Sequence, residues 1–296
     1  MTALHSKAVG VVTGPRRPDL SAGGRALADE LRARGATVDP VVWTDLDDLA
    51  DVDALVLRSC WDYHERIADF RAWLEGVDAA DAALLNPVRV VRWNVHKSYL
   101  RDLAEAGVDV LDTAFVERGS DRALRSVLEA RGWEDAVVKP AVGTSSAGAF
   151  RTTRADAAAD RERFASLVAD GDVLVQRFAP EIRDGERSLA FLGGAFSHAY
   201  RRVPADGDFR AHPSFDATVE QYDPADATVA AARAALDAVE DAVGVPPAAL
   251  PYARVDGVRR DGGFVLMELE LVEPWLGLHE VDGAADRLAD AVAAAL

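Results

Sequence analysis

Short apolar runs alternate with amphipathic stretches along the first 86 residues. Residues 9–12 form a continuous apolar run, which is typical of a strand buried on both faces of a parallel sheet. Ser21 can cap the helix that follows it, and Gly35 is a stop signal for that helix. Further strands are predicted at 37–42 and 54–58, and a helix at 65–74. This order predicts a small, doubly wound α/β layer that ends at Asn86-Pro87.

The rest of the chain mixes helical and strand patterns. Gly193-Gly194 and Gly262-Gly263 indicate two hairpin turns. Helices are predicted near 95–106, 121–130, 155–169, 225–243 and from 284 onwards. Strands are predicted near 108 and at 136–139, 173–178, 188–192, 195–200, 251–256 and 264–270, with a long polar loop at 204–224. We therefore divide the chain into an N-terminal layer, 1–86, a central segment, 87–175, and a C-terminal segment, 176–296.

Composition narrows the class of protein. The net charge of −17 over 296 residues argues against a nucleic-acid partner, which would need a basic face. The single cysteine, Cys60, excludes a disulfide framework. No signal-peptide pattern and no apolar run long enough to span a membrane are present, so we expect a cytoplasmic protein. The only lysines are Lys7, Lys97 and Lys139, and a lysine in an arginine-rich chain suits a phosphate site.

Acidic residues mark the two last predicted strands. Because side chains alternate along a strand, Arg254 and Asp256 share one face, and so do Glu268 and Glu270. If the hairpin forms, three carboxylates and a guanidinium point the same way, and carboxylates this close repel one another unless a cation is present. Oxygen ligands suit Mg²⁺. The same pattern would also fit a solvated outer face of a hairpin.

A lysine followed by small residues marks the central segment. Lys139 ends an apolar strand, and the loop after it contains Gly143, Ser145 and Ser146. An ammonium group and several backbone N–H groups in such a place can surround phosphates. The loop is not a P-loop, because no Gly-Lys-Ser/Thr follows the glycines. A merely flexible connection is the alternative.

Two further strand ends carry polar residues. Gln176 could bind a purine edge, and Glu186 or Glu181 could bind ribose hydroxyls. At the end of a strand in the N-terminal layer, Arg58 could hold a substrate carboxylate, although it could equally be a core arginine. Other polar or aromatic residues that could surround a substrate are Trp61, Tyr63, His198, Arg202 and Arg210.

The order of these pieces resembles the ATP-grasp superfamily from about residue 86 to residue 274. The segments RSCWDY (58–63), RWNVHK (92–97) and FSHA (196–199) are similar to the glutathione-synthetase-like branch. More narrowly, they resemble relatives of the O-ureido-D-serine cyclo-ligase of cycloserine biosynthesis. The resemblance implies an ATP-grasp fold, α/β with α+β character. Residues 1–86 would be its pre-ATP-grasp substrate domain, and 87–175 and 176–296 its central and C-terminal subdomains.

The resemblance also implies roles for individual residues. Lys97, Lys139, Gly143, Ser145 and Ser146 would contact ATP phosphates, and Gln176, Arg177, Phe178, Glu181 and Glu186 would surround adenine and ribose. Asp256, Glu268 and Glu270 would bind two Mg²⁺, with Mn²⁺ as an alternative. Catalysis would fall to Arg254, Lys139, Ser145 and Ser146. Many family members have asparagine at the position of Glu270 and an acid at that of His96, so the substrate does not transfer from any single relative.

These residues predict a ligase that activates a small, amino-acid-like carboxylate as an acyl phosphate and joins it to an amine, between molecules or within one. A phosphotransferase of the same fold and a non-catalytic nucleotide-binding protein are alternatives. A nicotinamide oxidoreductase lacks its glycine fingerprint here. A homodimer is one assembly open to the chain, and no membrane partner is expected.

Overall fold

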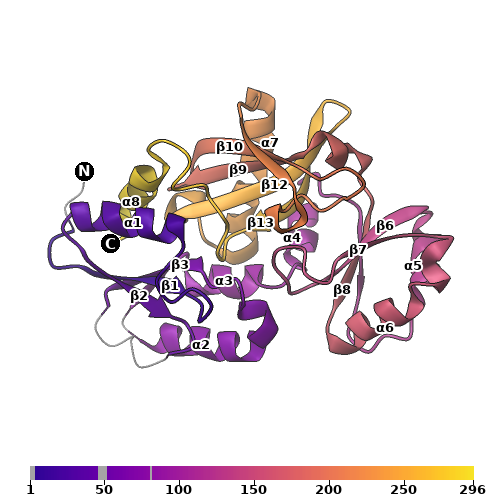
Figure 1. Cartoon of the computed structure of the whole chain (residues 1–296), viewed down its shortest axis with the longest axis horizontal. Helices are drawn as coiled ribbons and strands as arrows, with labels where there is room; N and C mark the ends of the chain where they lie inside the picture. The colour runs from indigo at the N-terminus through magenta and orange to yellow at the C-terminus, as the bar shows by residue number, and fades with distance from the viewer. Residues whose placement is uncertain (1–3, 46–51, 81) are drawn as a thin grey trace.

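The protein has three β-sheets, which follow one another along the molecule. The structure is a computed structural model, and it describes residues 4–45, 52–80 and 82–296. In Figure 1 the N-terminal sheet lies at one end, the largest sheet lies in the middle, and the third sheet lies at the other end. No helix in the described ranges is long and apolar enough to cross a membrane.

The N-terminal sheet is parallel and has the strand order β2-β1-β3-β4. β1 and β3 are almost wholly buried, as their apolar runs predict. The side chain of Ser21 accepts a hydrogen bond from the Gly24 N–H and so caps the first helix. The elements are β1 (Ala8–Thr13), α1 (Ala22–Ala33), β2 (Thr37–Val42), β3 (Ala54–Ser59), α2 (Ile67–Ala79) and β4 (Ala83–Leu85).

Two short helices lead into the second sheet, which is antiparallel with the order β5-β8-β6-β7. Two longer helices bury apolar residues of one side of this sheet, among them Val138 and Val175. The elements are α3 (Val88–Asn94), α4 (Tyr99–Glu105), β5 (Thr113–Val116), α5 (Leu124–Arg131), β6 (Asp135–Pro140), β7 (Phe150–Thr153), α6 (Arg161–Asp170) and β8 (Val173–Arg177).

The middle sheet is antiparallel with the order β11-β10-β9-β12-β13, and α7 packs on it. The last helix of the chain, α8, lies beside α1 at the N-terminal end of the molecule (Figure 1), where Arg34 pairs with Asp286 and Asp290. The elements are β9 (Glu186–Leu192), β10 (Ala195–Val203), β11 (Thr218–Tyr222), α7 (Asp226–Val243), β12 (Tyr252–Arg260), β13 (Gly263–Glu270) and α8 (Ala284–Ala294). Short 3₁₀ turns occur at Tyr63–Arg66, Asp156–Ala158, Pro180–Asp184, Pro213–Phe215 and Pro247–Ala249.

Several predicted elements were wrong. The helix predicted near 95–106 is present as α4, which begins later, at Tyr99. The helix before it, α3, was missed because its valines suit a strand equally well. The strand predicted near 108 is an isolated bridge from Val110 to Leu266, and the true strand, β5, begins later. β7 and β11 were missed: β7 is only four residues long, and β11 is almost wholly exposed, so neither has an apolar pattern.

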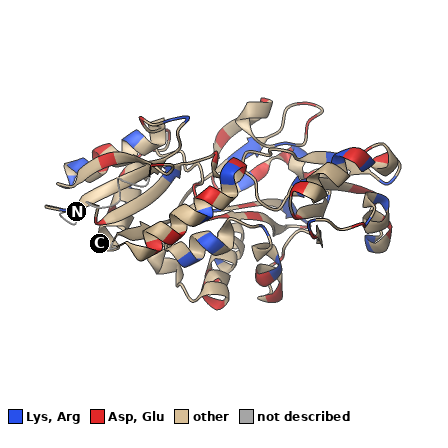
Figure 2. Cartoon of the chain, turned by 90° about the horizontal axis from the view of Figure 1, so that it is seen from below, with Lys and Arg blue, Asp and Glu red and all other residues tan. Residues whose placement is uncertain are grey.

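Charged side chains lie mainly on the outside of the molecule. Figure 2 shows acidic and basic positions interspersed along the outward helices. Most ion pairs of the described residues have at least one partly exposed partner, such as Arg16–Glu65 and Arg125–Glu129. Such pairs contribute little to stability. The pairs between buried side chains gather in one place, on β10, β12 and β13.

Candidate functional site

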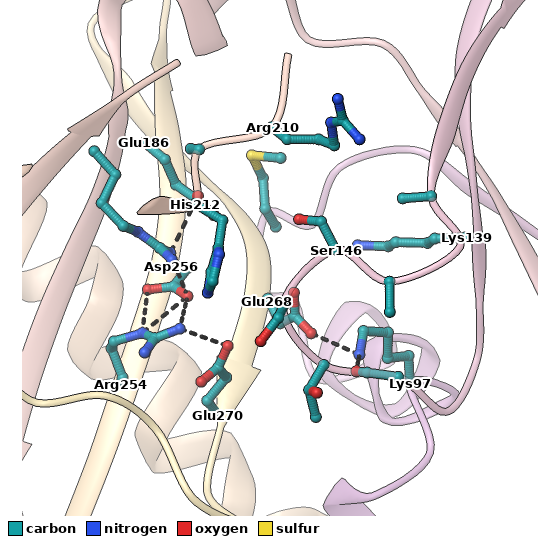
Figure 3. A pocket seen from close by; sticks show the side chains of 18 of the residues that line it. Lys97, Lys139, Ser146, Glu186, Arg210, His212, Arg254, Asp256, Glu268 and Glu270 are labelled. Carbon is teal, nitrogen blue, oxygen red and sulfur yellow. Dashed lines mark hydrogen bonds and ion pairs between the residues drawn. The ribbon is translucent and has the colours of Figure 1, made fainter. Parts of the chain in front are cut away.

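A cavity of about 480 Å³ lies where the three sheets meet. We call it the main cavity. Its walls come from β12 and β13 on one side, from β6, β8 and the loop 141–149 on the other, and from Trp61 and Tyr63 of the N-terminal layer. Figure 3 shows Lys97 and Lys139 facing Glu268 across it, with Arg254 and Asp256 on the strand side. Most of the predicted site residues converge on this space.

The pairing of β12 with β13 brings the predicted acidic residues onto one face. Arg254 lies opposite Glu270, and Asp256 lies opposite Glu268, in antiparallel register. All four line the main cavity. The shared face that strand alternation predicts is therefore present. The register shifts by one residue between Asp256 and Gly257, and this irregularity places Glu268, and not Met267, opposite Asp256.

Two arginines hold Asp256. Arg254 Nε donates to both of its carboxylate oxygens at 3.0 and 3.1 Å, and Arg254 Nη2 lies 2.9 Å from Oδ2. Arg202 Nη2, from β10, donates to the same Oδ2 at 2.9 Å. Arg254 also contacts Glu270 Oε1 at 2.5 Å, and Arg202 contacts Glu186 Oε2 at 3.1 Å. The result is a buried chain of alternating charges along the floor of the cavity.

The carboxylates of this chain have shifted pKa values. Burial, reinforced by Asp256 and Glu268, raises the pKa of Glu270 to about 7 despite Arg254. Burial also raises the pKa of Glu186 to about 7, although Arg202 opposes the shift. The pKa of Glu268 moves the other way: burial would raise it, but Lys97 and Lys139 outweigh burial and lower it to about 2. The carboxylates therefore repel one another around Glu270, whereas the two lysines compensate the charge of Glu268.

The two predicted phosphate lysines differ in their partners. Lys97 Nζ lies 2.8 Å from Glu268 Oε1 and donates to the Gly143 carbonyl at 2.7 Å. Among the described residues, Lys139 Nζ forms no ion pair, and burial lowers its pKa. Lys139 therefore presents an uncommitted cation to the cavity, whereas Lys97 ties the loop to the acidic strands.

The loop after β6 bends tightly over the cavity. Ser145 and Ser146 have φ values of 53° and 58°, which is the left-handed region that residues other than glycine seldom adopt. Thr144 Oγ1 donates to the Trp61 carbonyl at 2.9 Å and lies 3.2 Å from His64 Nδ1. The loop therefore contacts the N-terminal layer, and its small side chains line the cavity. This contact was not predicted.

The predicted nucleotide residues fall into two groups. Gln176, Arg177, Phe178 and Glu186 line the main cavity, with Gln176 Nε2 donating to Thr113 Oγ1 at 3.0 Å. Glu181 does not line it and instead accepts from Arg260 Nε at 2.8 Å, and this pairing lowers the Glu181 pKa. Of the two carboxylates considered for ribose, Glu186 is the one in the cavity.

The predicted substrate residues divide in the same way. Trp61, Tyr63, Arg202 and Arg210 line the main cavity, but Arg58 and His198 do not. The segment after β13 covers both: Arg58 donates to the Pro274 carbonyl, and His198 Nε2 lies 2.9 Å from the Leu276 carbonyl. Sequence reasoning did not predict that this segment returns across the end of β3, because nothing local signals a contact between residues so far apart.

Several lining residues were missed. Glu273 and Trp275 follow β13, and burial together with Glu270 raises the Glu273 pKa well above its usual value. His212 faces the acidic strands, and burial together with Arg202 and Arg254 lowers its pKa to about 4. The position of Glu273-Pro274 directly after an acidic strand was the one available signal; His212 lies in a polar loop and gave none.

The donor set of the acidic strands suits a divalent metal only in part. Carboxylate oxygens are the ligands that Mg²⁺ prefers, and the raised pKa of Glu270 shows negative charge that a cation would relieve. In the described part of the chain, however, no three His, Cys, Asp or Glu side chains already converge on one point. Asp256 faces two arginines and Glu268 faces Lys97. Metal binding here therefore requires ion pairs to open, and it stays a prediction.

Comparison with known proteins identifies the family. A profile described as the N-terminal domain of D-cycloserine synthetase DcsG matches residues 9–86, and one described as the ATP-grasp domain of prokaryotic glutathione synthetase matches residues 106–237. The cycloserine biosynthesis protein DcsG of Streptomyces lavendulae is 35% identical over 278 residues, which cover 90% of this chain and 91% of that protein. The chain belongs to the ATP-grasp ligase family.

Solved ATP-grasp structures agree with this assignment. The crystal structure of D-cycloserine synthetase DcsG is 33% identical and covers 97% of this chain and 99% of its own, with a TM-score of 0.88. D-alanine–D-alanine ligase from Bacillus anthracis, complexed with ATP, has a TM-score of 0.67 at 17% identity and covers 97% of this chain and 96% of its own, a likeness of fold alone. The predicted ATP-grasp fold and the resemblance to the cycloserine and glutathione-synthetase branches are confirmed.

Proposed function

We propose that the protein is an ATP- and Mg²⁺-dependent carboxylate–amine ligase. It activates a small, amino-acid-like carboxylate as an acyl phosphate and releases ADP. The observation that carries the proposal is the main cavity, in which an uncommitted Lys139 and a small-residue loop face Arg254 and the acidic strands. Membership of the ATP-grasp ligase family supports it, and so does the ATP bound by the B. anthracis ligase of the same fold.

ATP fits the cavity with its phosphates between the lysines and the loop. Lys97, Lys139 and the backbone of Gly143, Ser145 and Ser146 would contact the phosphates. Gln176, Arg177 and Phe178 would surround adenine. Glu186, whose raised pKa leaves it partly protonated near neutral pH, suits a hydrogen bond to a ribose hydroxyl.

The acidic strands would hold the metal. Enzymes of this family generally use ATP with Mg²⁺. Glu268 and Glu270 would hold Mg²⁺, and Asp256 would join them after one of its arginine contacts opens. When bound, Mg²⁺ neutralises phosphate charge and holds the terminal phosphate for transfer. ATP phosphates would supply the ligands that the protein does not.

The protein groups then orient and stabilise the reacting atoms. An oxygen of the substrate carboxylate attacks the terminal phosphorus of ATP, the bond to the bridging oxygen breaks, and ADP leaves. Arg254 and Lys139 would stabilise charge on the transferred phosphoryl group. The amine then attacks the acyl carbon, and inorganic phosphate leaves. Ser145 and Ser146, on the loop that contacts Trp61, help to exclude water that would hydrolyse the intermediate.

The cycloserine biosynthesis relative supports a small amino-acid-like substrate. The aromatic walls Trp61 and Tyr63, together with Arg202 and Arg210, leave space for such a molecule beside the nucleotide.

An ADP-release screen tests the function. D- and L-amino acids, their O- and N-carbamoyl derivatives and dipeptides are offered with Mg²⁺ and ATP, with and without an added amine. Hydroxylamine is included in parallel to trap an acyl phosphate as a hydroxamate. ADP release that depends on a carboxylate, with hydroxamate formation, supports the proposal. ADP release with an accumulating phosphorylated product and no dependence on an amine would indicate a phosphotransferase instead.

A further inference from the structure

A second, smaller pocket opens beside the main cavity, and we call it the side pocket. Its volume is about 190 Å³, several times the ~30 Å³ that one water molecule occupies in the liquid. Arg17, Trp61 and Trp275 line both spaces. A group bound in the side pocket can therefore belong to a molecule that also reaches the main cavity.

The side pocket lies at the point of the N-terminal sheet where ligands are expected. β1 is paired with β2 on one side and with β3 on the other, so the chain leaves β1 in one direction and later returns on the other side. Open α/β sheets bind ligands outside the carboxyl ends of the two strands at such a switch point. Arg17 follows β1, and Arg58 lies at the end of β3.

The walls of the side pocket favour an anion. They include Arg17, Arg58 and the first turn of α1, residues Ala22 and Gly23, and none of the described residues that line it is Asp or Glu. The first turn of a helix carries unpaired backbone N–H groups and a partial positive charge. The Ser21 hydroxyl, which caps the helix, already interacts with Gly24 N–H and with the Ser59 hydroxyl.

Arg58 is an independent observation that points to an anionic ligand. It is 4% exposed, and its Nη2 donates to the Pro274 carbonyl, but its Nη1 is buried without a hydrogen-bond partner among the described residues. Burial lowers the pKa of Arg58, which means that its charge is poorly compensated. A buried guanidinium left in this state is costly, and an anion beside it would remove the cost.

We propose that the side pocket binds a carboxylate of the substrate other than the carboxylate that is phosphorylated. The inference rests on the proposed ligase function and narrows its substrate class. An amino acid that serves as the amine carries such a second carboxylate, and so does a dicarboxylate that serves as the acyl donor. The side pocket then holds one carboxylate away from ATP, while Arg254 in the main cavity faces the other.

Acetate tests the side pocket without turnover. Thermal unfolding is measured with increasing acetate against chloride at equal ionic strength, with saturating Mg²⁺-ADP to occupy the lysines of the main cavity. The variants are Gly23→Leu, which fills the pocket, and Arg17→Gln. A Cβ at Gly23 would lie 3.7 Å from Leu278 Cβ and 3.8 Å from His279 Nδ1, so it enters without a clash. Arg16→Gln is the matched control, because Arg16 pairs with Glu65 outside both pockets.

Wild type and Arg16→Gln are expected to be stabilised by acetate beyond chloride. Gly23→Leu should fold at least as well as wild type, since leucine favours a helix more than glycine does, yet should not respond to acetate. Arg17→Gln should bind acetate about tenfold more weakly, the loss of one charged hydrogen bond. A wild type that responds no more to acetate than to chloride, or a Gly23→Leu protein that responds as wild type does, overturns the side pocket as an anion site.

A second arm decides whether the anion is part of the substrate. For any substrate pair that releases ADP, the carboxylate that is not activated is replaced by an amide. For wild type, kcat/KM is expected to be about tenfold or more lower with the amide than with the carboxylate. For Gly23→Leu, kcat/KM should be the same with both compounds. If wild type uses the amide equally well, the pocket takes a free anion and the substrate assignment fails. If no compound elicits ADP release, the proposed ligase function fails, and the acetate result for the side pocket still holds.

Discussion

Replacing Lys139 by methionine removes one positive charge from the main cavity and keeps an unbranched side chain of similar reach. Lys139 is the informative lysine because, among the described residues, its Nζ forms no ion pair, whereas Lys97 is committed to Glu268 and to Gly143. Its charge is therefore available to a phosphate. A hydrogen bond to a charged group is worth about 1.5–3 kcal/mol, so the Kd for Mg²⁺-ATP should rise roughly 10- to 150-fold.

The same substitution should not weaken the fold. Burial lowers the pKa of Lys139 in the folded protein, so the ammonium is less favourable there than in the unfolded chain. At pH values below its unfolded pKa, the buried lysine therefore opposes folding. The free energy of unfolding of Lys139→Met should equal or exceed that of wild type, while nucleotide affinity falls.

Calorimetric titration with a non-hydrolysable ATP analogue and Mg²⁺, together with urea unfolding, measures both quantities. Lys7→Met is the matched control: Lys7 pairs with Asp53 at 3.2 Å in the N-terminal layer, away from the main cavity, and its loss should leave affinity unchanged. Nucleotide affinity equal to wild type in Lys139→Met would refute the placement of phosphates beside Lys139. A large loss of stability would refute the reasoning from its burial.

Lys97→Met should behave differently from Lys139→Met, because it leaves Glu268 partly buried without the cation that holds its pKa at about 2. Urea unfolding should show that the free energy of unfolding falls by about 1–3 kcal/mol. An unchanged unfolding midpoint would contradict this. Asp256→Asn removes the shared partner of two buried arginines, and the same assay should show a loss of about 3–5 kcal/mol unless the arginines find other acceptors. Glu270 has a folded pKa of about 7, raised from its usual 4.5 by burial, so its contribution to stability is complete at acidic pH and is lost as pH rises through about 7. The free energy of unfolding, measured from about pH 5 to about pH 8, should therefore fall less steeply with pH in Glu270→Gln than in wild type. Added Mg²⁺-ATP should flatten the wild-type pH profile. Identical slopes in Glu270→Gln and wild type would contradict the raised pKa of Glu270.

Local patterns predicted the part of the site that lies on one hairpin. Side-chain alternation placed Arg254 with Asp256 and Glu268 with Glu270. The register shift between Asp256 and Gly257, which puts Asp256 opposite Glu268, was not predicted. Apolar runs predicted β1 and β3 almost to the residue, because strands buried on both faces carry the strongest sequence signal. These features depend on residues that are neighbours in the chain.

Contacts between distant segments were not predictable in the same way. Arg202 joins Asp256 only because β9 lies between β10 and β12, an order that no local pattern specifies. Arg58 does not line the main cavity: it donates to the Pro274 carbonyl and lines the side pocket, a placement that no local pattern specifies. Asn94, at the end of α3, hydrogen-bonds to the backbone of Leu269 and Leu271 and so supports the end of β13, a contact that no local pattern signals.

We infer that the terminal phosphate of ATP passes to an oxygen of the substrate carboxylate. The direct measurement labels that carboxylate with heavy oxygen and analyses the phosphate released during turnover by mass spectrometry. We expect one heavy oxygen from the carboxylate to appear in the inorganic phosphate, because the bond between the acyl carbon and the phosphate oxygen breaks when the amine attacks. Inorganic phosphate free of the label, with ADP formed and the amide product made, would contradict an acyl-phosphate intermediate.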